Sequence, residues 1–220
     1  VFAARPAEGG ALALRPRVAI LAAGAYERPV MVPGWTLPGV MTTGAAQTLW
    51  RSHRTLPGRR VVVAGTGPLN AQVALELARG GAEVAALAEA APRPVARLGP
   101  GLRMARADPR LAAKGALMLG ALGARGVFLL YRTRLARIEA EGDALVAVLA
   151  GPRGERRVAA DAVLMNDGFQ PSNEALRLLG CRMTWAPRFA ELRPERSAEC
   201  ETSVAGVFAV GDCCGLGGAP

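Results

Sequence analysis

Short apolar runs that stop at glycine alternate with segments of helical periodicity along most of this chain. The run Val18–Gly24 is typical of a strand buried on both faces. Upstream of it, residues 1–4 and 11–14 flank Gly9-Gly10, a pattern that predicts a small hairpin. From residue 25 to 43 prolines and glycines recur among few periodic positions, which predicts an ordered connection without a helix.

The central part of the chain predicts a strand, helix, strand unit preceded by one helix. Its elements are a helix over 43–54 with Thr42 or Thr43 as N-cap, a buried strand over 60–64, a helix over 68–79 that opens on proline, and a strand over 82–88.

A helix over 108–122 follows, with Asp108 as its cap and Pro109 at the first helical position. Short strands split by Gly-Asp and Gly-Pro pairs come next and predict a meander of antiparallel hairpins. These strands cover 126–131, 134–139, 144–149 and 156–160; a buried strand over 162–165, a helix over 172–179 and a strand over 206–211 complete the chain.

This order of elements is that of an α/β protein in which one domain is inserted in another. We expect a Rossmann-like, three-layer β/β/α NAD(P)-type domain over 57–162. Residues 1–56 and 163–220 would form a discontinuous and incomplete FAD-binding domain. Because the first residue is valine and the chain starts and stops inside structured segments, we interpret it as a fragment.

Charge adds little to this picture. The formal net charge is +9, but arginine supplies all but one of the 27 cations and is scattered along the chain, which looks like coding bias. The densest basic stretch contains Arg93, Arg97, Arg103, Arg106, Arg110 and Lys114. A solvated helical face is the interpretation we favour, with attraction of phosphates or of an acidic partner subunit as the alternative. Aromatic residues, 5% of the chain, do not interleave with it, so nucleic acid is a remote ligand.

The cysteines argue against a metal-binding protein, and the apolar segments argue against a membrane-spanning one. Cys181, Cys200, Cys213 and Cys214 have no CxxC spacing and no nearby histidine, so we predict no metal site and reduced cytoplasmic thiols. The longest apolar stretch, residues 111–131, is interrupted by Lys114 and Arg125, and the uninterrupted run that remains is too short to span a membrane.

A glycine-rich turn lies between the first strand and the helix of the central unit. Gly65 allows the tight turn and Gly67 the close approach of a pyrophosphate, which the backbone of Pro68 and Leu69 would meet at the helix N-terminus. Asn70 replaces the third glycine of the fingerprint. Glu89 ends the next strand, where a carboxylate accepts hydrogen bonds from the ribose; this favours NAD over NADP, although Arg93 is near.

A second constellation runs from Thr202 to Asp212: a threonine, a turn, a buried strand and Gly211-Asp212. Asp212 would lie at the carboxyl end of a strand, the edge at which open α/β sheets bind ligands. An aspartate that caps the following helix is the alternative.

Three segments carry a resemblance to known proteins. They are Ala22–Pro29, Pro33–Met41 and the Gly65–Pro68 turn. The chain resembles the two-dinucleotide-domain flavoprotein oxidoreductases across essentially its whole length. Within them it is most similar to the FAD/NAD-binding subunits of opine oxidase, hydrogen cyanide synthase and heteromeric sarcosine or proline dehydrogenases.

The resemblance implies FAD and NAD as cofactors. In that family the motif that ends at Gly211-Asp212 places its aspartate on the flavin ribityl chain. The family's Ala-Thr-Gly motif corresponds to Ala22–Gly24, where Ala23 replaces threonine and Gly24 keeps the turn. The amino-terminal glycine fingerprint that holds the FAD pyrophosphate is absent, so we expect the chain not to retain FAD alone.

The leading hypothesis is a flavoenzyme subunit of a hetero-oligomer that takes electrons from an amine or amino-acid donor of the opine, sarcosine, proline or glycine type. No residue is a convincing general base, and the catalytic residues stay unassigned. Alternatives are an NADH-dependent reductase of a small electron-carrier protein and a non-catalytic nucleotide-sensing subunit. Adjacent Cys213 and Cys214 bridge only through a strained ring, so a redox disulfide is disfavoured.

Overall fold

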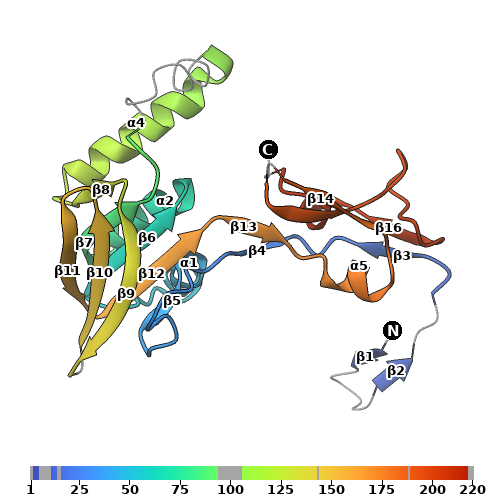
Figure 1. Cartoon of the computed structure of the whole chain (residues 1–220), viewed down its shortest axis with the longest axis horizontal. Coiled ribbons are helices and arrows are strands. Elements are labelled where there is room, and N and C mark those ends of the chain that lie inside the picture. The colour runs from blue at the N-terminus through green and yellow to red at the C-terminus, as the bar shows by residue number, and fades with distance from the viewer. Residues whose placement is uncertain are drawn as a thin grey trace. The chain divides into compact units, whose positions relative to one another are not determined.

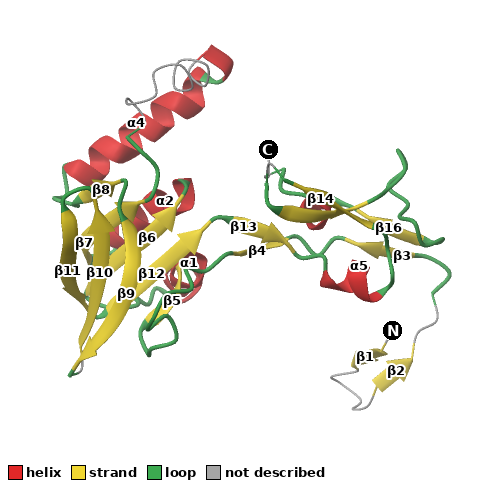
Figure 2. Cartoon of the chain, viewed as in Figure 1, coloured by secondary structure: helices red, strands yellow, loops and turns green. Residues whose placement is uncertain are grey.

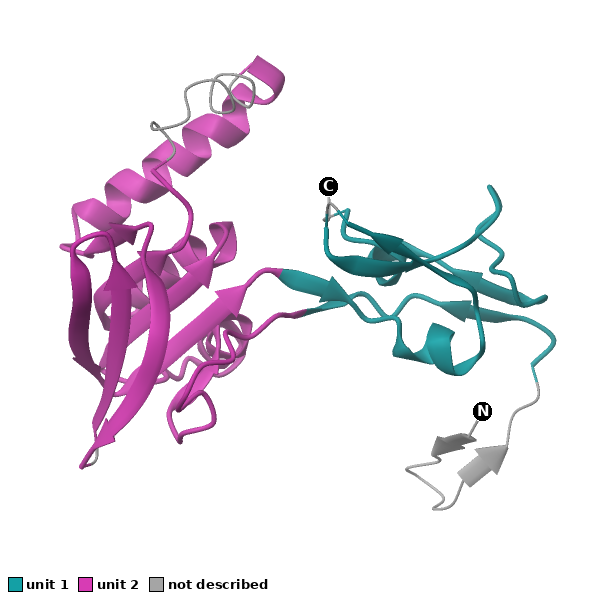
Figure 3. Cartoon of the chain, viewed as in Figure 1, with its two compact units in different colours: residues 1–26, 169–220 teal, residues 27–168 magenta. Residues whose placement is uncertain are grey.

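A computed structural model describes residues 16–93, 106–142, 144–187 and 189–217, together with the backbone of strands β1 (Phe2–Ala4) and β2 (Ala11–Ala13). The chain divides into two compact units, one made of residues 27–168 and the other of 1–26 with 169–220 (Figure 3). The predicted NAD-type domain, 57–162, lies within the first of these.

The unit 27–168 is built on a five-stranded parallel sheet (Figure 1). Parallel sheets normally have both faces covered, and their strands are therefore apolar throughout; accordingly, the side chains of residues 61–65 and 163–166 are buried. In sheet order the strands are β5 (Val40–Thr42), β12 (Ala162–Asp167), β6 (Arg60–Thr66), β7 (Glu83–Glu89) and β8 (Leu129–Tyr131).

Three helices contribute to the core on one face of this sheet: α1 (Thr43–His53), α2 (Pro68–Arg79) and α4 (Pro109–Gly123). The caps are local and match the sequence: Thr42 accepts the N–H of Ala45, and Asp108 accepts the N–H of Leu111 at 2.9 Å. Fully buried Val73 and Leu77 of α2 pack in the cluster that contains Val61 and Val63 of β6.

The opposite face of the sheet is covered by an antiparallel three-stranded sheet (Figure 2). Its strands are β9 (Arg134–Glu141), β10 (Ala144–Gly151) and β11 (Gly154–Ala160). Val62 and Ala64, the residues of β6 that alternate with Val61 and Val63, are buried in a second cluster with Leu145 and Leu149 of β10. The predicted three-layer β/β/α arrangement is therefore confirmed.

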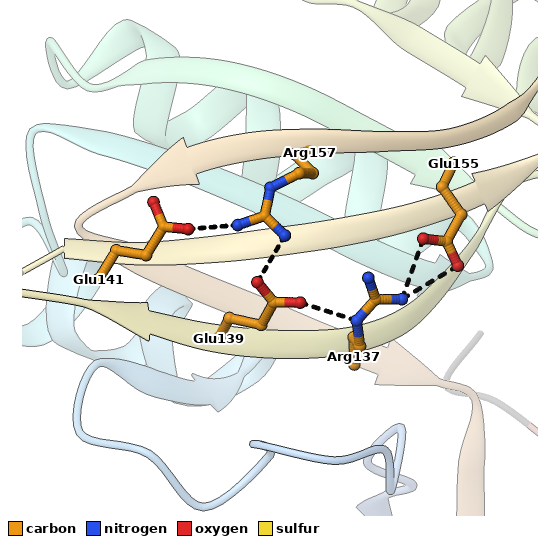
Figure 4. Close-up of polar contacts among 5 residues, drawn as sticks. All are labelled: Arg137, Glu139, Glu141, Glu155 and Arg157. Atoms are coloured by element: carbon orange, nitrogen blue, oxygen red, sulfur yellow. Dashed lines mark hydrogen bonds and ion pairs between the residues drawn. The ribbon is translucent and has the colours of Figure 1, made fainter.

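The outer face of the antiparallel sheet carries a network of five charged residues (Figure 4). Arg137 of β9 contacts Glu139 at 2.8 Å and Glu155 of β11 at 3.0 Å. Arg157 of β11 contacts Glu139 at 2.5 Å and also pairs with Glu141. These residues alternate along β9 and β11, so their side chains share one face of the sheet, on which Val146 and Val148 of β10 are buried between them. The network links β9 to β11 across β10.

The second unit contains three pairs of short strands besides the hairpin β1–β2. The pairs are β3 (Ala19–Leu21) with β16 (Val207–Ala209), β4 (Ala25–Glu27, whose last residue belongs to the unit 27–168) with β13 (Phe169–Pro171), and β14 (Met183–Ala186) with β15 (Glu191–Pro194). Helix α5 (Glu174–Leu178) and a short 3₁₀ helix, η2 (Gly211–Cys214), complete it. Leu176, Cys181, Ala209 and Cys213 lie in its core cluster.

Two predictions from the sequence are wrong. The segment 18–24 is not buried on both faces, since Ile20 is 69% exposed; among the described strands, β3 pairs with β16 alone. The strand predicted over 126–131 does not join the antiparallel meander. It forms β8, which pairs in parallel with β7, because the apolar side chains of this segment suit either sheet.

Other predictions are confirmed with small shifts of bounds. The hairpin near the start, the strand, helix, strand unit and the helix at 109–123 are all present. Prolines and glycines between residues 25 and 43 do form an ordered connection, which additionally contains β4 and β5. None of the helices in the described ranges is long and apolar enough to cross a membrane.

Candidate functional site

The glycine-rich turn joins β6 to α2 at the carboxyl edge of the parallel sheet. Gly65 has φ +136°, and a Cβ atom at this position would lie 1.9 Å from the carbonyl oxygen of Asn166 on the neighbouring strand β12. Gly67 has φ 111° and ψ 167°, a conformation that is essentially restricted to glycine. Both positions therefore require glycine: residue 65 for the tight turn and residue 67 for its backbone conformation.

Glu89, at the end of β7, holds this turn closed. Its Oε1 accepts hydrogen bonds from the hydroxyl of Thr66 at 2.5 Å and from the N–H of Ala91 at 2.9 Å, and its Oε2 accepts the N–H of Gly67 at 3.1 Å. A carboxylate has about four acceptor positions, so Oε2 keeps one for another donor. That position suits a ribose hydroxyl.

The N-terminus of α2 is uncapped by any described side chain. Pro68 occupies the first helical position and has no N–H, and the Gly67 N–H is taken by Glu89. The backbone N–H groups of the first helical turn, beginning at Leu69, therefore remain available to an anion together with the positive end of the helix dipole. The Leu69 side chain packs against the core, so Leu69 could bind an anion through its backbone N–H alone.

A cavity of about 390 Å³ lies beside the turn and is lined by Thr66, Gly67, Pro68 and Glu89 at its polar end. Its walls are mostly apolar and come from β7, α2, α4 and β8: Leu87, Ala71, Met118, Leu119, Leu129 and Tyr131 are among them. An apolar cavity with a few convergent polar groups is the usual form of a small-molecule site.

Tyr131 is a wall of the cavity that sequence reasoning missed. It ends β8 directly beside Glu89 in the parallel register. Burial, and then the charge of Glu89, raise the pKa of its hydroxyl, which therefore stays protonated and able to donate. Thr66 was missed as well. It occupies the variable position of the fingerprint, and only the pairing of β6, β7 and β8 shows that these residues meet.

Asn70, which replaces the third fingerprint glycine, belongs to a buried polar network rather than to the cavity. Its Oδ1 accepts the hydroxyl of Thr43 at 2.8 Å and its Nδ2 donates to the Asn166 carbonyl at 3.0 Å. The Asn166 amide in turn donates to Glu27 at 2.7 Å, and Glu27 also accepts the N–H of Gly44 at 2.8 Å. This network ties the start of α2 to α1 and β12.

In the other unit, the predicted residues Ala23, Gly24, Gly211 and Asp212 all follow the carboxyl ends of the paired strands β3 and β16. Strands β3 and β16 are parallel, with Leu21 opposite Ala209, so the segments that follow them emerge side by side. Gly24, with φ +71°, follows β3 after Ala23, and Gly211, with φ +74°, follows β16. Asp212 lies in η2, where its Oδ1 accepts the N–H of Gly217 at 3.1 Å. This hydrogen bond takes one of about four acceptor positions on the carboxylate.

The cysteines lie in the unit that contains Asp212. Cys213 and Cys214 are buried free thiols with their sulfurs 3.8 Å apart. Burial and the neighbouring Cys213 raise the pKa of Cys214 to about 11. A thiol in that state is a poor nucleophile at neutral pH. No group of three or more metal-ligating side chains was found in the described residues.

Comparison with known proteins decides the family. The family model described as pyridine nucleotide-disulphide oxidoreductase matches residues 8–219. The chain belongs to this family. Its members use FAD and NAD(P). The glycine turn at residues 65–67, the uncapped N-terminus of α2 and the Glu89 carboxylate are features that suit a dinucleotide.

Curated relatives are subunits of larger enzymes. An opine oxidase subunit of Rhizobium meliloti is 35% identical over 218 residues, which cover 93% of this chain and 45% of the relative. The hydrogen cyanide synthase subunit HcnB of Pseudomonas protegens is 34% identical, covering 90% and 44%. The alpha subunit of sarcosine oxidase from Rhizobium meliloti is 28% identical, covering 91% and 18%. The chain thus spans less than half the length of these relatives.

Solved structures share its fold. The flavoprotein disulfide reductase RclA of Escherichia coli has a TM-score of 0.70 at 19% identity, and the match covers 98% of this chain and 43% of the reductase. A ferredoxin reductase of Rhodopseudomonas palustris has a TM-score of 0.64 at 26% identity, covering 94% and 46%.

Proposed function

We propose that this chain is part of an FAD- and NAD-dependent oxidoreductase subunit that takes electrons from an amine or amino-acid donor of the opine, sarcosine, proline or glycine type. The observation that carries the nucleotide assignment is the Glu89 carboxylate beside an uncapped helix N-terminus and an apolar cavity of about 390 Å³. The names of the relatives, opine oxidase and sarcosine oxidase, support the class of donor.

In this proposal NAD binds at the carboxyl edge of the parallel sheet, and FAD binds at the carboxyl ends of β3 and β16. Gly65 and Gly67 shape the turn, and the N–H groups that follow Pro68, from Leu69 onward, meet the NAD pyrophosphate. The free acceptor position of Glu89 binds a ribose hydroxyl, and Tyr131 closes the apolar wall. The flavin contacts come from Ala23, Gly24, Gly211 and Asp212. Bound NAD and FAD supply the hydride chemistry, and the protein positions them.

The nucleotide assignment is tested by calorimetric titration of the full chain with NADH, NADPH, ATP and FAD. Glu89→Ala removes the ribose acceptor, and Gly67→Val forces a glycine-only conformation onto a branched residue. Glu83→Ala is the matched control, because Glu83 lies at the opposite end of the same strand and pairs with Arg60.

We expect NADH to bind the parent chain and the control variant, and to bind neither Glu89→Ala nor Gly67→Val. Circular dichroism of each variant separates loss of binding from loss of fold. A preference for ATP would favour a nucleotide-sensing subunit. Absence of binding by a folded chain would refute the assignment.

A second candidate function is an NADH-dependent reductase of a small electron-carrier protein. The 26% identity to a solved ferredoxin reductase over 94% of this chain favours it. Steady-state assays on the whole protein distinguish the two. Turnover with opines, sarcosine, proline or glycine supports the first, whereas oxidation of NADH coupled to reduction of a ferredoxin supports the second.

In the sequence, Asn70 in place of the third fingerprint glycine keeps open the alternative of a non-catalytic, nucleotide-sensing subunit. Its side chain makes two buried hydrogen bonds that fasten α2 to its neighbours. The replacement of glycine thus has a structural role in the helix start, and Asn70 no longer argues for a sensor.

A further inference from the structure

Helix α4 is apolar around almost its whole circumference, yet one side of it is exposed. From Gly115 to Gly123 it has no charged or polar side chain. Leu122 is buried in the core, whereas Leu117, on the opposite part of the helix surface, is 74% exposed. A helix that is apolar on all sides is normally buried. The exposed side therefore indicates a surface that another element covers.

This exposed side borders a groove of about 570 Å³ between α2 and α4. The apolar part of its lining comes from both helices: Leu75 from α2, and Ala113, Leu117, Met118 and Ala121 from α4. A groove between two helices with an apolar lining is the kind of surface that accepts the apolar face of a third helix. Small residues in its wall allow that helix to approach closely.

The groove is also basic. Arg79 of α2 and Arg110 and Lys114 of α4 line it, and in the part of the chain that the structure describes none of the three pairs with a carboxylate. Glu76, the acidic residue of the lining, is engaged by Arg51 of α1 at 2.6 Å. These three cations are therefore available to pair with carboxylates of another molecule.

We propose that the α2–α4 groove binds an acidic amphipathic helix of a partner subunit. Apolar side chains of that helix would fill the groove, and its Asp or Glu residues would pair with Arg79, Arg110 and Lys114. A second copy of this chain is disfavoured, because two copies of this face would bring like charges together. A bilayer is disfavoured because the groove is concave and α4 has no aromatic residue to anchor at a membrane surface.

The proposal does not depend on the nucleotide assignment. Curated relatives of this chain are named as subunits, which supports a protein partner. In this proposal Arg110 and Lys114, two residues of the basic stretch noted in the sequence, bind an acidic partner subunit.

The test uses the full chain and a fluorescein-labelled helical peptide of three Leu-Glu-Glu-Leu-Ala-Glu-Leu repeats, followed by fluorescence anisotropy. A peptide with lysine at every glutamate position is the control for charge. Two variants alter the groove, Arg110→Glu with Lys114→Glu and, separately, Leu117→Glu. Arg153→Glu, on the exposed β10–β11 turn, is the matched charge reversal outside the groove. Circular dichroism verifies that each variant folds.

We expect the glutamate peptide to bind and its affinity to fall about tenfold or more in both groove variants. Arg153→Glu should bind like the parent chain, and the lysine peptide should not bind. Equal binding of the two peptides, equal binding by the groove variants, or no binding at all would overturn the proposal. So would dimerisation of the chain in sedimentation, or binding to phosphatidylglycerol vesicles, if either is abolished by Leu117→Glu.

A photo-cross-linking residue at position 117 extends the test to cells that express the protein. Cross-links to an acidic helical segment of another polypeptide, mapped by mass spectrometry, support the proposal. Cross-links confined to basic or non-helical segments contradict it.

Discussion

The side-chain amide of Asn70 donates a hydrogen bond to the backbone carbonyl of Asn166 at 3.0 Å, and both side chains are buried. The same carbonyl would clash with a Cβ at position 65. Strand β12 thus approaches the glycine turn so closely that residue 65 must be glycine, while residue 70 can carry a side chain that bonds to it. The departure from the glycine fingerprint is compensated by this contact.

Removal of the Asn70 side chain should destabilise the protein. Asn70→Ala leaves the Thr43 hydroxyl and the Asn166 carbonyl without these partners in a buried place, at a cost of about 1–3 kcal/mol. Urea denaturation of Asn70→Ala, Thr43→Val and the double variant should show that the effects are not additive, because the two residues share a hydrogen bond. Thr48→Ala on the exposed side of α1 should change stability by less than about 0.5 kcal/mol. Simple additivity would contradict the network.

Gly65 and Gly120 should respond oppositely to alanine. Gly65→Ala places a Cβ 1.9 Å from a backbone oxygen at φ +136°, so we expect a loss of about 3 kcal/mol or more. Gly120 lies in α4, where a Cβ would meet no atom within 4 Å, and Gly120→Ala should stabilise the helix by about 0.5–1 kcal/mol. Thermal unfolding measures both. A neutral Gly65→Ala would contradict the close approach of β12.

The charged face of the antiparallel sheet should contribute stability that depends on pH. Hydrogen bonds from Arg137 and then from Arg157 lower the pKa of Glu139 below its ordinary value of 4.5. A lowered carboxylate pKa contributes stability above the unfolded-state pKa, and this contribution is lost as the pH falls through the folded-state pKa.

Glu139→Gln tests this dependence. Its urea midpoint should be lower than that of the parent chain near neutral pH, and the difference should shrink as the pH falls below about 4.5. Glu199→Gln, at an exposed position, is the control and should show no such dependence. A difference that stays constant across this range would count against the network.

The cysteines should differ in reactivity. With a pKa raised to about 11 by burial and by Cys213, Cys214 should react slowly with iodoacetamide at about pH 8. Cys200, which is only partly buried, should react first. Cys200 and Cys214 lie on the same tryptic peptide, residues 197–220, so fragmentation of that peptide by tandem mass spectrometry follows each site, and Cys200→Ser should remove the fast phase. Equal rates at the two sites in the folded protein would contradict the burial of Cys214.

Helix caps and hydrophobic periodicity, which depend on residues close together in the chain, were sufficient to predict much of the secondary structure. The strand, helix, strand unit around Gly65 and the Asp108-Pro109 start of α4 were predicted from sequence, because caps and periodicity act within one or two turns. Gly65, Gly67 and Glu89 of the candidate site were predicted in the same way. Their roles at a nucleotide remain predictions until ligand binding is measured.

Only the tertiary structure decided which strands pair and which side chains meet. An apolar run at 126–131 fits a parallel or an antiparallel sheet equally well, and its place beside β7 follows from the packing of α4 and the rest of the unit. That pairing brings Tyr131 beside Glu89, and the insertion of β12 next to β6 gives Asn70 its partner. Contacts between residues far apart in the chain leave no periodic signal in sequence, since they depend on burial shared among several elements.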